Sequence, residues 1–253
     1  MSQTTAYCKV SICPVRAEAK DSSEMVTQLL FGEVIDILED GEKWLKIRTY
    51  HDNYEGYIDP KQIRRLTKKE VGRWLDGLSY ISNLTQEIST PWGKQLIFKG
   101  SFLPFNCKES FSIGNDEFSL LGDPTFAPSS NPVEIAKQYL NAPYLWGGKT
   151  PFGIDCSGLT QMTFRFLEIN LPRDASQQVE FGNDTPFEDR LPGDVMFFQN
   201  DAGKIIHVGI VIDSETIIHA SGQVRIDAYD NRGIKHYSNE YYTHYYVALK
   251  RMF

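Results

Sequence analysis

Two apolar segments near the end of the chain, each interrupted by a single histidine, place the strongest constraint on the fold. Residues 205–212 are Ile-Ile-His-Val-Gly-Ile-Val-Ile, and residues 216–220 are Thr-Ile-Ile-His-Ala. Nearly continuous apolar runs of this length are typical of buried strands, and the residues between them, Asp213 to Glu215, predict a tight turn. We therefore expect an antiparallel hairpin in which His207 and His219 lie on one face as diagonal neighbours.

A cysteine upstream of this hairpin gives the two histidines a chemical role. Cys156 follows a glycine-containing turn, from Trp146 to Ile154, and precedes apolar residues at helical spacing, so we expect it at a helix start whose first turn points outward. Backbone N–H groups and the positive dipole end at a helix start favour the thiolate. One imidazole could then take the cysteine proton while the other orients it, which is the arrangement of nucleophile, base and orienting group.

Each of these residues also has a structural interpretation when it is taken alone. A cysteine is commonly a small buried apolar residue, and a histidine in an apolar strand is more often a core residue with a satisfied hydrogen bond. Two histidines on one hairpin, together with a helix-start cysteine, favour catalysis over both alternatives.

The composition indicates a globular protein with more than one domain. A chain of 253 residues exceeds a typical single domain, and 41 % hydrophobic with 23 % charged residues is ordinary for a soluble fold. The net charge of -7 argues against nucleic-acid binding, which requires a basic surface, and gives no support to binding of anionic membranes. No apolar segment reaches the ~18–20 residues of a membrane span.

The N-terminus and the cysteines bear on the compartment and on metal binding. The first residues lack the basic and apolar pattern of a signal peptide, so a full-length chain is expected in the cytoplasm; an exported chain that had lost its signal would look the same. The four cysteines form no disulfide framework. Cys8 and Cys13 would supply only half of a zinc site, and no second close Cys/His pair lies nearby. We expect no metal and no cofactor.

The first half of the chain is predicted to form two small β-rich modules. Residues 1–66 contain short strand-like segments at 34–38, 44–48 and 54–59, separated by turns, which is the pattern of a small barrel. Their order, with Gly-Glu, a hydrophobic strand, Gly-Glu-Lys-Trp-Leu-Lys-Ile and Tyr-Glu-Gly-Tyr-Ile, resembles bacterial SH3-like domains. Residues 67–128 are predicted to begin with a helix from Lys68 to Leu75 capped by Thr67 and to form a second, diverged SH3-like module. Residues 124–132 are predicted to be a linker.

Residues 129–253 are predicted to form an α+β domain, because helices come first and strands follow. Asn131 as cap and Pro132 at the first helical position begin one helix, and the cysteine helix comes next. A turn at residues 191–194 precedes a strand at 195–198 and the histidine hairpin. Paired tyrosines between residues 241 and 246 indicate a final strand on the same sheet.

Five blocks of this last domain resemble the NlpC/P60 cysteine peptidases, which cut bacterial cell-wall peptides. They are Tyr144-Leu-Trp-Gly-Gly, Asp155-Cys-Ser-Gly-Leu, Leu191-Pro-Gly-Asp, His207-Val-Gly-Ile and Ile218-His-Ala. The resemblance implies a papain-like fold with Cys156 as nucleophile, His207 as base and His219 as third member of a triad. With the two SH3-like modules in front, the chain also resembles the γ-D-glutamyl-L-diamino-acid endopeptidases of murein peptide recycling, whose pocket binds the free amine of an N-terminal L-alanine.

Further roles follow from the same resemblance. Tyr144 stands where the family has a tyrosine near the thiolate, although a core aromatic residue is the alternative. Asp155 and Ser157 flank the nucleophile and could contact substrate, and Asp155 would serve equally well as a helix cap. Asp174 matches the aspartate that binds the substrate amine. Ala175 replaces a serine-like residue of relatives and so removes one hydrogen bond to substrate.

The family also draws a tyrosine and a glutamate for the amine pocket from its first SH3-like domain. Tyr54 and Glu24 are the candidates in this chain, with an exposed loop tyrosine and an ordinary surface glutamate as the alternative interpretation.

The function expected from these observations is hydrolysis of the γ-D-glutamyl to L-diamino-acid bond in short murein peptides with a free N-terminal L-alanine. The protein is expected to act as a monomer on a small peptide, with neither nucleic acid nor membrane as a partner. Two alternatives remain, an exported hydrolase of intact peptidoglycan and a non-catalytic muropeptide-binding protein. The sequence leaves open whether the diamino acid is diaminopimelate or lysine.

Overall fold

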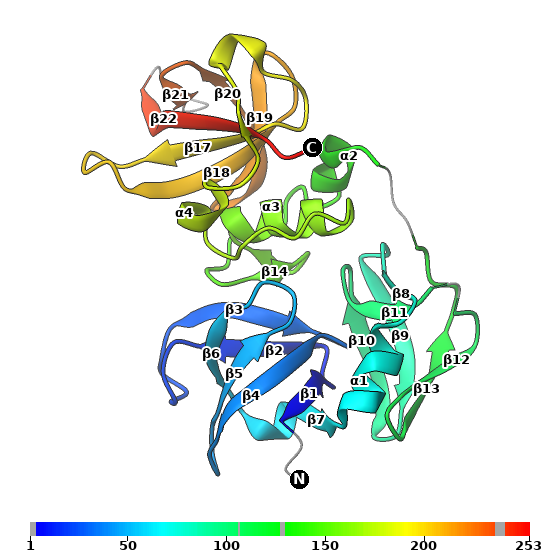
Figure 1. Cartoon of the computed structure of the whole chain (residues 1–253). Coiled ribbons are helices and arrows are strands. Elements are labelled where there is room, and N and C mark those ends of the chain that lie inside the picture. The colour runs from blue at the N-terminus through cyan, green and yellow to red at the C-terminus, as the bar shows by residue number, and fades with distance from the viewer. Residues whose placement is uncertain (1–3, 106, 127–129, 236–240) are drawn as a thin grey trace. The chain divides into compact units, whose positions relative to one another are not determined.

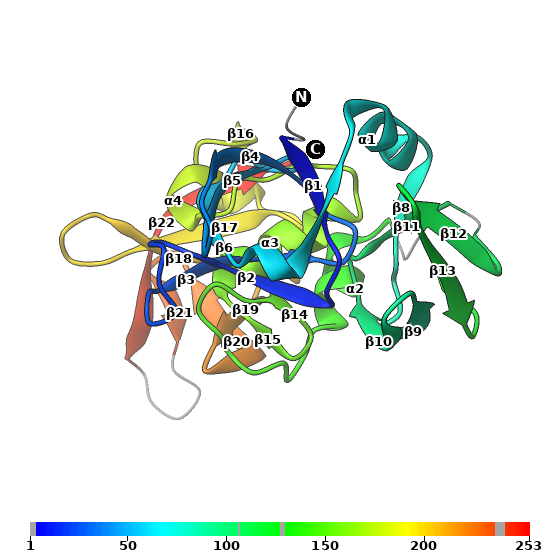
Figure 2. The ribbon, with the colours of Figure 1, turned by 90° about the horizontal axis from the view of Figure 1, so that it is seen from below.

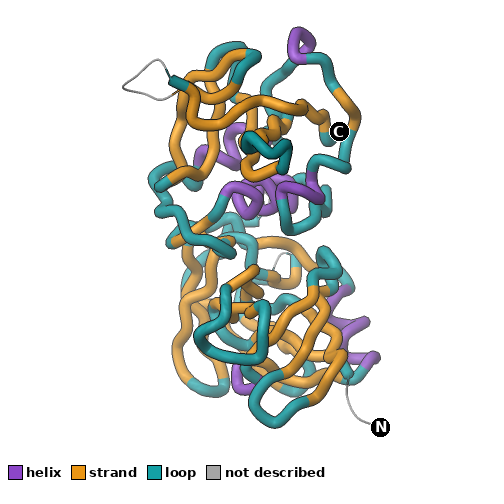
Figure 3. Tube along the Cα trace, turned by 90° about the vertical axis from the view of Figure 1, so that its left-hand side faces the viewer, coloured by secondary structure: helices purple, strands orange, loops and turns teal. Residues whose placement is uncertain are grey.

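The computed structural model describes residues 4–105, 107–126, 130–235 and 241–253. Internal contacts divide the chain into two compact units, Met1–Pro128 and Ser129–Phe253, and strands predominate in both (Figure 3). The predicted linker at 124–132 includes residues 127–129, which lie outside the described residues. No helix among the described residues is long and apolar enough to cross a membrane.

The first unit begins with a seven-stranded antiparallel sheet that curls into a small barrel (Figure 1). The strands lie in the order β3-β2-β6-β5-β4-β1-β7. Their bounds are β1 Thr5–Cys8, β2 Ile12–Arg16, β3 Met25–Leu30, β4 Val34–Asp40, β5 Leu45–Thr49, β6 Glu55–Ile58 and β7 Ile63–Leu66, with a 3₁₀ turn, η1, at Pro60–Gln62. Cys8 and Cys13 are fully buried in its core, so both behave as small apolar residues.

The second half of this unit contains one helix and two small sheets (Figure 2). The elements are α1 Lys68–Leu75, β8 Leu78–Tyr80, β9 Thr85–Thr90, β10 Gly93–Phe98, β11 Phe102–Pro104, β12 Ser110–Ile113 and β13 Asp116–Leu121. The predicted helix and its cap are confirmed, since Thr67 and Glu70 form a reciprocal capping box at the start of α1.

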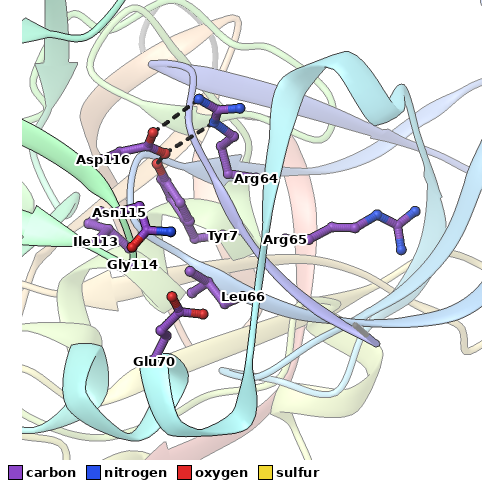
Figure 4. Close-up of a pocket in the computed structure, with 9 residues that line it drawn as sticks. All are labelled: Tyr7, Arg64, Arg65, Leu66, Glu70, Ile113, Gly114, Asn115 and Asp116. Atoms are coloured by element: carbon purple, nitrogen blue, oxygen red, sulfur yellow. Dashed lines mark hydrogen bonds and ion pairs between the residues drawn. The ribbon is translucent and has the colours of Figure 1, made fainter. Parts of the chain in front are cut away.

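The two modules predicted within the first unit share one hydrophobic core. Tyr7 and Phe31 from the first module pack with Trp74 and Phe118 from the second. At the edge of this core, the Tyr7 hydroxyl donates a 2.5 Å hydrogen bond to Asp116. Arg64 points at the same carboxylate beside a cavity of about 330 Å³ (Figure 4). The separation of the modules at residue 66 therefore stays a prediction, and the described residues 4–105 and 107–126 form one packed body.

The second unit is an α+β fold in which helices pack on a closed sheet. Its strands lie in the order β16-β22-β17-β18-β19-β20-β21, and β22 also pairs with β21, so β17 to β22 close into a barrel. The strands are β16 Asn183–Asp184, β17 Val195–Gln199, β18 Ile205–Val211, β19 Thr216–Ser221, β20 Gln223–Asp230, β21 Gly233–Lys235 and β22 Tyr242–Arg251. A separate two-stranded sheet, β14 Lys149–Thr150 and β15 Gly153–Ile154, precedes them in the sequence. The helices are α2 Pro132–Lys137, α3 Cys156–Arg165 and α4 Ala175–Gln178, with a 3₁₀ turn, η2, at Phe187–Asp189.

The cysteine helix lies against the histidine hairpin. In Figure 1, α3 runs beside the strands β18 and β19, and the most extensive helix-to-strand packing of the unit is between α3 and β18. The predicted start of α3 at Cys156 is confirmed, with Asp155 as cap. The expectation that its first turn points outward is wrong, because Cys156 and Ser157 each expose only 6 % of their surface.

The register of the hairpin places the two histidines as predicted. Gly209 pairs with His219, so His207, two residues earlier on β18, is the diagonal neighbour of His219 on the same face. The turn between the strands is stabilised by Asp213, whose carboxylate accepts hydrogen bonds from the backbone N–H groups of Glu215 and Thr216.

Candidate active site

The start of α3 is held by a buried ion pair. Asp155 caps the helix by accepting a 2.6 Å hydrogen bond from the Gly158 N–H. Its other oxygen accepts from the Gly147 N–H at 2.8 Å and from the Arg173 guanidinium at 2.5 Å. Arg173 also donates to the Ser157 hydroxyl at 2.8 Å. The structure thus gives Asp155 and Ser157 internal partners that fix the residue between them, and a substrate contact by either stays a prediction.

Two glycines allow the turn before the cysteine to approach the helix closely. A side chain at Gly158 would collide with the Gly148 carbonyl, and one at Gly148 would collide with the Gly153 carbonyl. Sterics therefore explain the last glycine of the Trp-Gly-Gly motif and the glycine of the Cys-Ser-Gly motif, since only glycine leaves room for these backbone contacts.

The histidines form a hydrogen-bonded chain that ends on a carboxylate. His207 Nε2 lies 2.8 Å from His219 Nδ1, and His219 Nε2 lies 3.0 Å from Asp227 Oδ2. An ionised carboxylate can only accept, so His219 carries its proton on Nε2 and accepts at Nδ1. His207 then carries its proton on Nε2, which leaves His207 Nδ1 as the free acceptor that a general base needs.

Cys156 lies against the same hairpin. Its sulfur forms hydrogen bonds with the backbone N–H groups of Val208 and Ser157, and both bonds lower the thiol pKa. Burial and the nearby Asp155 carboxylate act in the opposite direction and together raise the pKa of Cys156 to about 12. The pKa of His207 falls below its usual range, mainly because of burial and then because of His219 and His244. The expected preference for thiolate is therefore wrong for the resting site, in which the Cys156 thiol and the His207 imidazole are both neutral.

A third histidine, absent from the sequence-based prediction, covers the ring of His207. His244 on β22 stacks on His207 with ring centroids 4.0 Å apart and planes 27° apart. Burial lowers the pKa of His244 to about 4, so this ring is neutral near pH 7 and its stacking adds no charge to the site. No local sequence signal marks it, because its position depends on pairing between distant strands.

Tyr144 is brought to the nucleophile by the chain that precedes the cysteine turn. It is half-buried, and its backbone N–H donates to the Gly222 carbonyl at 2.9 Å. Burial, followed by the proximity of Cys156 and Asp155, raises the pKa of its phenol. The hydroxyl is therefore protonated near pH 7 and able to donate a hydrogen bond; its predicted part in holding the oxyanion stays a prediction.

Asp174 is half-buried at the start of α4. Its neighbour Arg173 is buried against Asp155, and the Asp174 carboxylate also raises the pKa of Arg173. Gln178 fixes this segment to α3, because its amide donates to the carbonyls of Ser157 and Pro172 at 3.0 and 2.8 Å. The segment carrying Asp174 is thus firmly attached to the cysteine helix, while its binding of a substrate amine stays a prediction.

Tyr54 and Glu24 lie in the first unit, on the β5–β6 and β2–β3 connections. Arg16, the last residue of β2, pairs with Tyr57 in an antiparallel arrangement, so the end of β2 and the start of β6 lie at the same end of the first barrel, and both connections emerge there. Their contribution to a pocket beside Cys156 stays a prediction. Among the described residues, no group of three or more His, Cys, Asp or Glu side chains could hold a metal ion.

A helix-start cysteine packed against a strand-borne histidine pair on an α+β fold defines a cysteine peptidase of papain-like architecture. The NlpC/P60 family model matches residues 141–251, and the model of the bacterial dipeptidyl-peptidase Sh3 domain matches residues 15–63. The chain belongs to the NlpC/P60 family and carries a bacterial SH3 domain in front of the peptidase domain.

Relatives of known name match most of the chain or about half of it. The γ-D-glutamyl-L-lysine dipeptidyl-peptidase of Bacillus subtilis is 28 % identical over 223 residues, which cover 77 % of this chain and 71 % of the relative. A probable endopeptidase of Haemophilus influenzae is 34 % identical over 134 residues, covering 50 % of this chain and 80 % of the relative. The crystal structure of an NlpC/P60 family protein from Bacillus cereus has the same fold, with a TM-score of 0.81 at 20 % identity, covering 98 % of this chain and 99 % of that one.

Proposed function

We propose that the protein is a cysteine peptidase that hydrolyses the bond between γ-D-glutamate and an L-diamino acid in short murein peptides with a free N-terminal L-alanine. The observation that carries this proposal is the extent of the similarity. The relative that matches 77 % of the chain is a γ-D-glutamyl-L-lysine dipeptidyl-peptidase, and the SH3 domain in front matches a model described for bacterial dipeptidyl-peptidases. A dipeptidyl-peptidase must measure two residues from a free N-terminus, which is the task proposed for the region before the peptidase domain.

The proton positions in the site support a stepwise acyl transfer. As the Cys156 sulfur attacks the γ-carbonyl carbon, His207 Nδ1 takes the thiol proton. The carbonyl oxygen becomes an oxyanion, which backbone N–H groups at the start of α3 and the Tyr144 hydroxyl stabilise. His207 then gives the proton to the leaving amine of the diamino acid, and the C–N bond breaks.

Water completes the reaction. His207 accepts a proton from a water molecule that attacks the thioester, and the proton returns to the Cys156 sulfur as the dipeptide acid leaves. The imidazolium that forms at His207 in each half-reaction is stabilised by His219 and the Asp227 carboxylate behind it.

Specificity for a free amine is proposed to come from opposite charge. Asp174 would pair with the ammonium group of the N-terminal L-alanine, with Tyr54 and Glu24 of the first unit completing the pocket. An acetylated or sugar-linked peptide has no ammonium group, so it would lack this attraction to the carboxylates and would bind more weakly.

The proposal is tested with four peptides and two proteins. L-Ala-γ-D-Glu-L-Lys, its diaminopimelate analogue and the N-acetylated form of each are incubated with the wild-type protein and with Cys156→Ala, and the products are followed by mass spectrometry. Release of L-Ala-γ-D-Glu from the free peptides by the wild type alone is expected. Equal cleavage of free and acetylated peptides would exclude the amine pocket, and no cleavage by the wild type would exclude the activity.

A second candidate is hydrolysis of intact peptidoglycan, because half of the chain also matches a probable endopeptidase at 34 % identity. Purified cell-wall sacculi serve as the substrate that separates the two. Release of soluble fragments from sacculi at a rate similar to cleavage of the free peptides would favour this candidate.

A further inference from the structure

A carboxylate on the third strand of the histidine sheet lies at the end of the hydrogen-bonded chain behind Cys156. Asp227 on β20 is 7 % exposed, and its Oδ2 atom is 3.0 Å from His219 Nε2. β20 pairs with β19, and the register places Arg225 opposite His219. Asp227 therefore lies one pleat further along β20, on the side of His219 that faces away from His207.

Arg225 holds this carboxylate in place. Its Nε and Nη2 atoms both donate to Asp227 Oδ2, at 2.8 and 2.7 Å. A guanidinium remains charged at every accessible pH and has no acceptor, so it keeps its partner carboxylate ionised. Burial acts to raise the pKa of Asp227, but the hydrogen bonds and charges of His219 and Arg225 outweigh it and lower that pKa.

The position of the proton on His219 decides which nitrogen of His207 can accept a proton. With an ionised acceptor at Asp227, His219 is protonated on Nε2, His207 is protonated on Nε2, and His207 Nδ1 is free to accept. With only donors beside His219 Nε2, both protons would move to the opposite nitrogens. His207 Nδ1 would then carry a proton, and His207 would be unable to act as a base.

We propose that Asp227, held by Arg225, is a positioning residue of the active site, which sets the tautomer of His219 and through it leaves His207 Nδ1 unprotonated. This inference rests on the proposed function only where activity is measured. The other titratable or charged groups that act on the two histidines are His244 on β22 and Arg225 on β20. Neither of them is an acceptor that could replace the carboxylate near pH 7, because His244 is directed at His207 by stacking and not by a hydrogen bond.

Two substitutions of Asp227 test its hydrogen-bond acceptor and its negative charge separately. Asp227→Leu removes the acceptor and leaves Arg225 as the only polar neighbour of His219 Nε2, so the protons are expected to move. Asp227→Asn keeps an oxygen that can accept, and is expected to retain the wild-type tautomers with a smaller loss of activity. Asp184→Leu is the matched control, because Asp184 is in the same unit, its side chain is 89 % exposed, and its carboxylate pairs with Lys250.

Nitrogen NMR of histidine-labelled protein measures the proton positions directly, without any substrate. The wild type is expected to show Nε2-protonated His207 and His219, and Asp227→Leu to show both protonated on Nδ1, with assignments checked by single His→Gln variants. In the peptide assay, Asp227→Leu is expected to lose ~10²–10⁴-fold in kcat, the range of general acid–base catalysis, with a much smaller change in KM. Asp184→Leu is expected to match the wild type in both.

The outcomes are distinguishable from failure of the proposed function. Wild-type His219 protonated on Nδ1, or unchanged tautomers in a folded Asp227→Leu protein, would overturn the inference even if activity fell. If Asp227→Leu does not fold, the wild-type spectrum decides: His219 protonated on Nε2 supports the role of the Asp227 acceptor, and His219 protonated on Nδ1 overturns it. The expected tautomers in a protein that cleaves none of the peptides would support the positioning role and contradict the proposed substrate.

Discussion

Replacing Arg173 with methionine removes the cation from the carboxylate that caps the catalytic helix. The side chains of Arg173 and Asp155 expose 1 % and 5 % of their surface, so the pair is screened very little by water. Methionine fills a similar length with apolar atoms but leaves Asp155 with two backbone N–H partners and the Ser157 hydroxyl, none of which carries a positive charge. Removing one member of a buried pair costs about 3–5 kcal/mol, because the other charge is left without compensation.

The consequence should be visible in both stability and chemistry. For a unit of this size, 1 kcal/mol corresponds to roughly 3–5 °C in Tm, so Arg173→Met should lower the Tm of the second unit by about 10–20 °C. Catalysis should also fall, since the Ser157 hydroxyl loses its donor beside the nucleophile. Differential scanning calorimetry with Lys235→Met as control provides the test, because Lys235 forms an exposed ion pair with Asp230. A loss below about 1 kcal/mol, the value of surface pairs, would refute the reasoning.

Three further predictions address the histidines, the thiol and the first unit. Gly209→Ala should lower kcat, because the added Cβ would lie 3.0 Å from His219 Cβ and 2.9 Å from Ile217 Cδ1 and so displace His219; unchanged kcat in steady-state assays would contradict this. Alkylation of Cys156 by iodoacetamide should rise about tenfold per pH unit from pH 7 to 10, because the raised pKa keeps the thiol protonated below about 12; a plateau below pH 8 would indicate a thiolate instead. Thr67→Ala should destabilise the first unit by about 0.5–2 kcal/mol through loss of the α1 cap, and an unchanged denaturation midpoint would show that the cap contributes nothing.

The parts of the fold that were predicted correctly have local causes. The start of α1 at Lys68 follows from Thr67 and Glu70 three residues later, and the start of α3 follows from Asp155. The pairing of His207 with His219 follows from a short turn and the two-residue period of strands, which fix the register without any distant contact.

The parts that were missed depend on contacts between distant segments. His244 reaches His207 only because β22 pairs with β17, far from it in sequence. The thiol pKa depends on burial beneath the hairpin, which helix-start electrostatics alone cannot indicate. Likewise, the core shared by Tyr7 and Phe118 is invisible to a strand-by-strand interpretation of the first unit.

Asp227 is an intermediate case. Arg225 and Asp227 alternate along a strand that follows Ser221 and Gly222, and a turn at that point predicts that β20 returns beside His219. Two charged residues on one face of a strand that pairs with a histidine-bearing strand therefore predict a hydrogen-bond partner for that histidine.

The most direct test of the central claim is to trap the acyl enzyme. Wild-type protein is mixed with L-Ala-γ-D-Glu-L-Lys, quenched in acid within the first turnover, digested and mapped by mass spectrometry, with Cys156→Ala and the N-acetylated peptide as controls. The account predicts an L-Ala-γ-D-Glu adduct on the peptide that contains Cys156, and no adduct or cleavage with either control. An adduct on another cysteine, or undiminished cleavage by Cys156→Ala, would contradict it.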